Sequence, residues 1–373
     1  MSTEMIKDRV APATDASHAL IGTSVVNRNA ARASISEIER VPLAHFAWFV
    51  VAYNVAVIVW GAYVRATGSG AGCGSHWPLC NGEFLPTTPQ TQTVIEFTHR
   101  VTSGVSLVLV AILLIWCWRR TAKGDRPRHS AVAAAVLLFN EAFLGALLVL
   151  VDHVGGLDRS ATHALFLCLH FGNTLLLLAA LALTAKWLSN RDGRLGVVPK
   201  PFQMIAMGLG LVSVMAIGMT GSLANLGDTM FPADSLRRAV VQDFSSSSHI
   251  LLRLRVLHPV AAVIGSIYVL WLLQAFWRKQ ERFGWVPLLT ITLTGQIALG
   301  AMNVILLAPV WLQMTHLLVA EILWILLALA SADQLFASHH SGVPPSRIAS
   351  TGVSWSFGFK DAGHISRRGG PSS

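Results

Sequence analysis

The feature that most constrains this chain is a series of eight apolar runs, each long enough to cross a bilayer as a helix. Only 13% of the residues are charged, whereas a soluble domain carries about 25%. Because a bilayer offers no water to backbone groups, such runs fold as helices. We therefore predict an all-α polytopic membrane protein with eight transmembrane helices. They are expected at about 43–64, 94–118, 131–151, 161–188, 202–223, 250–276, 285–307 and 312–336.

Most of the basic residues lie between these runs. Segment 119–128, for example, begins with Arg119 and Arg120 and is typical of a cytoplasmic loop. The net charge of +9 therefore follows the positive-inside rule, and we expect no nucleic-acid partner. An even number of spans puts both termini on the same side, and the basic loops predict that this side is the cytoplasm. A bacterial inner membrane is the preferred location, and the mitochondrial inner membrane is the alternative.

A faint internal repeat suggests two similar four-helix bundles. His99 and His258 each precede an apolar run that contains Gly or Ser, whereas His170 and His316 each precede a run rich in Leu and Ala. Four-helix bundles hold cofactors between facing helices. The predicted organisation is a mobile cytoplasmic tail at 1–41, an N-terminal half at 42–188, a C-terminal half at 189–336 and a cytoplasmic tail at 337–373.

Four histidines, His99, His170, His258 and His316, fall at similar depths in the even-numbered spans. At 1.5 Å per residue, each lies within a few turns of the outer surface. A single histidine in a span is as easily an interhelical hydrogen-bonding residue as a ligand. Four at matched depth favour haem, because its iron takes two imidazoles from opposite faces of a flat ring, whereas zinc prefers closer or mixed ligands. We interpret them as two pairs of axial ligands.

Glu96 precedes His99 by three residues, so both side chains share one face of a helix. An acidic residue at the centre of a span costs about 2.5 to 3.5 kcal/mol, and less near the end. An interfacial or capping role is therefore compatible with Glu96, but its neighbour favours a role in handling protons or charge at a reacting centre. Arg65 and Arg100 are candidates to pair with haem propionates, with snorkelling interfacial arginines as the alternative.

Two of the four cysteines, Cys73 and Cys80, share the predicted external loop after the first span. A disulfide across this short loop would stabilise it by about 2 to 3 kcal/mol in the chain-entropy model. A structural bridge and a redox-responsive dithiol near a cofactor are both compatible with this pattern. Cys117 and Cys168 lie inside apolar runs and are expected to be small buried side chains.

Together these segments resemble the haem A synthase family. The matching segments are GSGAGCGSHWPLCNG at 68–82, EFTHR at 96–100, LHFGNTLLLLAAL at 169–181, LHP at 257–259 and THLLVAEILW at 315–324. The resemblance covers about residues 43–336 and leaves the tails outside it. It implies eight helices in two similar halves, which agrees with the independent interpretation of the apolar runs.

The resemblance also implies site roles. His258 and His316 would hold a haem b for electron transfer, and His99 and His170 would surround the substrate, haem O. A ring methyl of haem O would be oxidised to a formyl group by successive hydroxylations, which gives haem A for terminal oxidases. Glu96 matches the essential acidic residue of the family. Cys73 and Cys80 match its external cysteine pair, but the later external loop of this chain has no second pair, which argues against a thiol relay that needs one.

The resemblance leads to expectations about partners. Haem O would enter laterally with its farnesyl tail in membrane lipid, and haem O synthase is the expected pathway partner. The residues do not indicate an electron donor, and a homo-oligomer is compatible with them. The main rival function is a non-catalytic di-haem b electron carrier, which needs the four histidines but not Glu96 or the cysteine loop. A transporter would require broken spans near the midplane, and the sequence does not favour it.

Overall fold

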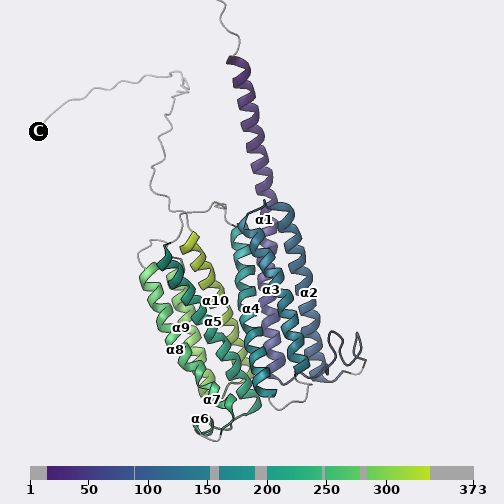
Figure 1. Ribbon diagram of the computed structural model, residues 1–373, viewed down its shortest axis with the longest axis vertical. Helices are drawn as coiled ribbons and strands as arrows, with labels where there is room; N and C mark the ends of the chain where they lie inside the picture. The colour runs from purple at the N-terminus through teal and green to yellow at the C-terminus, as the bar shows by residue number, and fades with distance from the viewer. Residues whose placement is uncertain are drawn as a thin grey trace, which may run out of the picture. The chain divides into compact units, whose positions relative to one another are not determined.

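The computed structural model describes residues 15–87, 89–151, 159–189, 200–245, 248–277 and 284–336, with side chains from residue 41 onward except at 151, 159–161 and 277. Regular structure in these residues is helical, apart from an isolated β-bridge between Cys80 and Glu83. The all-α fold class is therefore confirmed (Figure 1). The elements are α1 (Asp15–Ala66), α2 (Thr91–Arg120), α3 (Arg126–Val151), α4 (Arg159–Ser189), α5 (Pro201–Met230), α6 (Leu236–Phe244), α7 (Ile250–Arg255), α8 (Leu257–Leu272), the π-helix η1 (Leu273–Trp277), α9 (Trp285–Ile305) and α10 (Val310–Phe336).

Eight helical segments in the described residues are long and apolar enough to cross a membrane. Each overlaps one of the predicted runs, so the prediction of a multi-pass membrane protein is confirmed. In the sixth segment, α7, α8 and η1 follow one another over Ile250–Phe276. The candidate spans expose apolar side chains on their outward faces. Examples are Val101, Val105 and Val108 of α2, which suit contact with lipid.

The structure adds helix in two places outside the predicted spans. Helix α1 begins at Asp15, well before its candidate membrane-spanning part at Val41–Ala66. The mobile tail predicted at 1–41 therefore includes helix from Asp15 onward, and its residues 1–14 lie outside the described part of the chain. Helix α6 forms within the loop predicted after the fifth span. The C-terminal tail at 337–373 also lies outside the described residues and stays a prediction.

The helices of each predicted half pack against one another. Helix α4 packs against α1 and α3, α2 packs against α1 and α3, α5 packs against α8, and α9 packs against α10 (Figure 1). Helix α4 also packs directly against α5 and α10. Trp324 of α10 fixes one of these contacts, because its indole Nε1 donates a 2.6 Å hydrogen bond to the carbonyl of Leu175 in α4. The division into two similar bundles stays a prediction.

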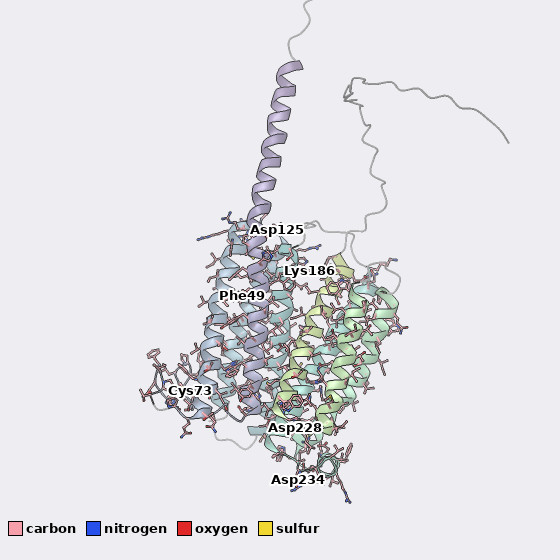
Figure 2. The ribbon with its side chains drawn as sticks, turned by 180° about the vertical axis from the view of Figure 1, so that it is seen from behind. Phe49, Cys73, Asp125, Lys186, Asp228 and Asp234 are labelled. Carbon is pink, nitrogen blue, oxygen red and sulfur yellow. A yellow bond between two sulfur atoms is a disulfide. The ribbon has the colours of Figure 1, made fainter. Side chains whose placement is uncertain are left out.

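The loops that matter for function gather at one end of the helices. Figure 2 places Cys73, Asp228 and Asp234 at this end, and Asp125 and Lys186 at the opposite end. This is the alternation expected when consecutive spans run antiparallel. We call the first of these the Cys73 end. The structure contains no membrane, so the assignment of this end to the external side stays a prediction.

Candidate functional site

The four predicted ligand histidines lie near the Cys73 end of their helices. Each is six to eight residues from the start of its candidate span, at Thr91, Thr162, Ile250 and Val310. At 1.5 Å per residue this corresponds to about 9–12 Å along the helix. Helices α2, α4, α8 and α10 carry His99, His170, His258 and His316 in that order.

His258 and His316 come together across α8 and α10. Their ring centroids are 6.4 Å apart and their planes are nearly perpendicular, at 87°. Nδ1 of His258 lies 3.0 Å from the backbone carbonyl of Ile217 in α5. Because a carbonyl can only accept, Nδ1 carries the proton and Nε2 keeps its lone pair. This is the tautomer that binds a metal through Nε2. Nε2 of His316 lies 3.2 Å from Nε2 of Gln296 in α9.

Each of the four histidine rings packs against a glycine of the preceding membrane-spanning helix. A methyl group at any of these glycines would lie close to the Cε1 atom of the ring. The pairs and the distances from an ideal Cβ are Gly61–His99 at 2.7 Å, Gly145–His170 at 3.7 Å, Gly221–His258 at 3.0 Å and Gly300–His316 at 3.2 Å. Three of the four distances are too short for an ordinary Cβ contact, so the absence of a side chain makes room for the ring.

The surroundings of His99 and His170 differ. Nδ1 of His99 is buried and has no hydrogen-bond partner among the described residues. Nδ1 of His170 lies 3.3 Å from Oε1 of Glu141 in α3, although the contact lacks the alignment of a full hydrogen bond. A carboxylate therefore lies beside one histidine of the predicted N-terminal pair, and the pairing of His99 with His170 stays a prediction.

Glu141 is a candidate site residue that the sequence interpretation missed. Its carboxylate accepts a 2.5 Å hydrogen bond from Nδ2 of Asn173 and another from the hydroxyl of Thr174. Nδ2 of Asn173 also donates to the carbonyl of Leu137 at 2.9 Å. An acidic residue inside a span was a usable signal, because such residues are rare and mark functional sites. The contact of Glu141 with His170 could not be predicted from the sequence, because the two residues lie on different helices.

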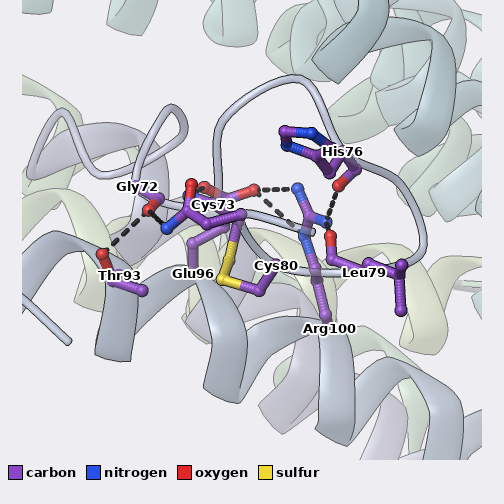
Figure 3. A network of polar contacts seen from close by, with 9 residues as sticks. Gly72, Cys73, His76, Leu79, Cys80, Thr93, Glu96 and Arg100 are labelled. Carbon is purple, nitrogen blue, oxygen red and sulfur yellow. Dashed lines mark hydrogen bonds and ion pairs between the residues drawn. A yellow bond between two sulfur atoms is a disulfide. The ribbon is translucent and has the colours of Figure 1, made fainter. Parts of the chain in front are cut away.

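Glu96 contacts the Cys73 loop (Figure 3), and its predicted role beside a reacting centre stays a prediction. Glu96 is 4% exposed, and its Oε2 accepts a 2.8 Å hydrogen bond from the backbone amide of Cys73. Its Oε1 accepts from Nε and Nη2 of Arg100 at 3.1 and 2.5 Å. Nη1 of Arg100 donates to the carbonyls of His76 and Leu79, both at 2.6 Å. The pair therefore fastens the loop to the first turns of α2.

Gly72 lets this loop lie directly on α2. A Cβ at Gly72 would be 2.5 Å from the carbonyl group of Gln92 and 2.6 Å from the amide of Thr93, a distance that no side chain tolerates. The carbonyl of Gly72 accepts a 2.8 Å hydrogen bond from the hydroxyl of Thr93. Next to it, Cys73 and Cys80 form a disulfide in the structure and are 0% and 1% exposed. The loop thus covers its sulfur atoms.

The two candidate propionate-binding arginines have different surroundings. The guanidinium of Arg100 is engaged by Glu96 and by the loop carbonyls. Arg65, at the end of α1, lies with Nη2 3.2 Å from Nε2 of His163 and also acts electrostatically on His170. Arg65 therefore contacts α4 about two turns before His170. Propionate binding by either arginine stays a prediction.

The loop that follows α5 has its own arginine anchor. Arg255 of α7 is 9% exposed, and it bonds Asp228 of α5 at 2.8 Å and Asp243 of α6 at 2.6 Å. These two ion pairs hold α6 and α7 against the end of α5. The arrangement parallels the Glu96–Arg100 anchor of the Cys73 loop.

Glu321 is a second acidic residue that the sequence interpretation passed over. It lies five residues after His316 in α10, is 1% exposed, and neither carboxylate oxygen has a hydrogen-bond partner among the described residues. Among all the residues that the structure describes, no group of three or more His, Cys, Asp or Glu side chains is arranged to hold a metal ion. A haem held by two imidazoles needs no such group.

Comparison with known proteins adds an independent observation. Residues 44–328 match the model of a cytochrome oxidase assembly protein family, COX15-CtaA. The chain is 30% identical to haem A synthase of Shouchella clausii over 285 residues, which cover 73% of this chain and 90% of that protein. It is 38% identical to haem A synthase of Halalkalibacterium halodurans over 140 residues, 38% of this chain and 44% of that protein.

A further match differs in length. A protoheme IX farnesyltransferase of Thermus thermophilus is 42% identical over 296 residues, which cover 79% of this chain and 48% of that protein. The chain therefore spans about half the length of this relative. The family model's match at residues 44–328 agrees with the stretch of about 43–336 that carries the family resemblance.

Proposed function

This chain belongs to the haem A synthase family of cytochrome oxidase assembly proteins, and we therefore propose that it converts haem O to haem A. Membership of the family makes it an oxidoreductase with a role in haem A synthesis. The specific reaction that we propose is the oxidation of one ring methyl of haem O to a formyl group by successive hydroxylations. The observation that carries the proposal is the position of four histidines at the Cys73 end of four helices, with the rings of His258 and His316 6.4 Å apart.

The geometry of His258 and His316 supports a haem b site. Metal–imidazole bonds are about 2 Å long and a ring centre lies about 1 Å behind its nitrogen, so two imidazoles on one metal have centres about 6 Å apart. The observed separation of the ring centroids is 6.4 Å. The carbonyl of Ile217 fixes the tautomer of His258, as backbone partners of metal-bound imidazoles do. A haem b held there would supply electron transfer.

The N-terminal pair is the proposed site for the substrate. His99 and His170 would hold the iron of haem O, and Arg65, whose Nη2 lies 3.2 Å from Nε2 of His163, would bind a propionate. Glu96 and Arg100 hold the Cys73 loop on the first turns of α2, one turn from His99. The role of Glu96 in handling protons or charge near the reacting methyl is part of the proposal. Glu96→Gln, which keeps the size of the side chain, tests that role.

The lipid and protein partners follow from the substrate. The farnesyl tail of haem O is apolar, so haem O reaches the site from membrane lipid. The Thermus relative is named for the farnesylation of protoheme, and the chain matches less than half of it. We assign farnesylation to a partner, haem O synthase, and not to this chain. The proposed location is the bacterial inner membrane, with both termini cytoplasmic and the Cys73 end external.

Haem analysis of cells tests the proposed function. The chain is expressed in a bacterial host that makes haem O but no haem A, and extracted haems are separated and identified as pyridine haemochromes. Haem A is expected with the wild-type chain and is lost or strongly reduced with His170→Ala or Glu96→Gln. The appearance of haem b alone in the purified wild-type protein, without haem A in the cells, would instead support a di-haem electron carrier.

A further inference from the structure

The four histidines differ in what holds the ring nitrogen Nδ1. His258 has a backbone carbonyl, at 3.0 Å. His170 has a carboxylate, at 3.3 Å. Nδ1 of His99 and of His316 is buried without a hydrogen-bond partner among the described residues. A histidine that donates from Nδ1 to a carboxylate is a more basic ligand at its other nitrogen, and its orientation is better fixed.

The carboxylate beside His170 is itself held in place. Both oxygens of Glu141 accept hydrogen bonds, from Asn173 and from Thr174 of α4. Asn173 is fixed in turn, because its amide donates to Leu137 and its side-chain oxygen accepts from Asn140 at 2.8 Å. An ionised carboxylate has about four lone-pair sites, so these two hydrogen bonds leave room for a contact with the His170 ring. Nδ1 of His170 lies 3.3 Å from Oε1 of Glu141, without the alignment of a full hydrogen bond, whereas Nδ1 of His99 has no carboxylate contact among the described residues.

His99 is held in a different way. Its ring is confined by contact with Gly61, where an ideal Cβ would be 2.7 Å from Cε1. The ring is confined by shape. Among the described residues, Nδ1 of His99 has no hydrogen-bond partner that would make Nε2 a stronger metal ligand. Two imidazoles bound equally tightly to one iron would leave no position for a reactant. An unequal pair resolves this, because the weaker ligand can leave.

We propose that Glu141 is a positioning residue that makes His170 the permanent ligand of the haem at the N-terminal site and leaves His99 as the exchangeable ligand. The inference rests on the proposed function, since it concerns the same substrate haem. It deepens that function by assigning unequal roles to two histidines that the sequence pattern treats as equivalent. Nε2 of His170 would remain bound to the iron, and His99 would be the ligand that leaves.

The first test changes the carboxylate and measures the potential of the bound haem. In Glu141→Gln the side chain keeps its size but loses its charge. Loss of such a partner typically weakens metal affinity 10–100-fold. We expect the N-terminal haem O to bind at least tenfold more weakly, and its midpoint potential to rise by about 59 mV for each tenfold difference between ferric and ferrous affinity. The haem at His258 and His316 is the internal control, and its potential and spectrum should not move.

The second test compares the two histidines directly in the purified full-length protein that carries both haems. His99→Ala should retain haem O in a high-spin, five-coordinate form. His170→Ala should lose it, while both variants keep the low-spin haem at the C-terminal pair. The proposal is overturned if His170→Ala retains haem O and His99→Ala loses it, if both lose it equally, or if Glu141→Gln leaves potential and affinity unchanged.

These outcomes separate the inference from the proposed function. If the wild-type protein binds no haem O and makes no haem A, the proposed function fails before any variant is compared. If the wild-type protein does both and the two histidines behave alike, only the unequal roles fail. A loss of the low-spin C-terminal haem in Glu141→Gln would mean that the variant does not fold, and the histidine comparison then decides.

Discussion

The anchor between Glu96 and Arg100 gives a prediction whose size follows from the structure. In Arg100→Met, the stem of the side chain is kept and the guanidinium is removed. Glu96, whose side chain is 5% exposed, then retains the amide of Cys73 as its hydrogen-bond donor. Two loop carbonyls, of His76 and Leu79, lose their donor at the same time. The loop is the part that can move to relieve the buried carboxylate.

The magnitude follows from the burial of this ion pair. Removal of one partner of a buried pair costs about 3 to 5 kcal/mol, because it leaves an uncompensated buried charge. We expect this cost to lower the free energy of local loop opening by about 3 kcal/mol, because the open loop exposes Glu96 to water. At 1.4 kcal/mol for each factor of ten, the open population rises about 100-fold.

The assay is the rate at which the disulfide is reduced. Cys73 and Cys80 are 0% and 1% exposed, so a reductant reaches them mainly from the open loop. With limiting reductant and the free cysteines blocked beforehand, the rate follows the open population. Arg238→Met is the matched control, because Arg238 and Asp234 form an i,i+4 pair at the same end that is more than 60% exposed and worth about 0–1 kcal/mol. A rate for Arg100→Met within threefold of wild type would refute the anchoring role.

Three further predictions use other parts of the structure. Gly221→Ala should lose the low-spin haem b spectrum, because a Cβ would be 3.0 Å from the ring of His258, whereas Gly208→Ala on the same helix meets nothing within 4 Å and should keep it. Glu321→Met should leave the thermal midpoint in detergent unchanged or higher, because a buried carboxyl without partners adds little stability; a fall of several degrees would reveal a partner. Trp324→Phe should lower the free energy of unfolding by about 1 kcal/mol through the lost indole hydrogen bond to α4, and an unchanged value would show that this bond adds nothing.

The apolar runs alone were enough to predict the membrane-spanning helices. Their length and composition report directly on the bilayer, so the eight candidate spans and the all-α fold followed without knowledge of packing. Matched depth of the four histidines was also readable, since it depends on counting residues from span ends. The pairing of His258 with His316 depended on the inferred repeat, and the structure brings these rings to 6.4 Å.

Contacts between helices were beyond the sequence pattern. Glu141 and His170 lie on different helices, and the pattern does not say which faces of α3 and α4 meet. Arg100 was expected near a propionate because it lies at the end of a span, yet its donors are directed to a loop whose path was not predictable. The requirement for glycine at position 72 was not predictable for the same reason, because it arises only where the loop backbone touches α2.

The central claim is that paired imidazoles at the Cys73 end hold haem iron. Near-infrared magnetic circular dichroism of the oxidised, purified protein tests it most directly, because the charge-transfer band of ferric haem identifies its axial ligands. We predict a bis-imidazole band in the wild-type protein that disappears from the C-terminal haem in both His258→Ala and His316→Ala. A bis-imidazole band of wild-type intensity in both variants would contradict the account.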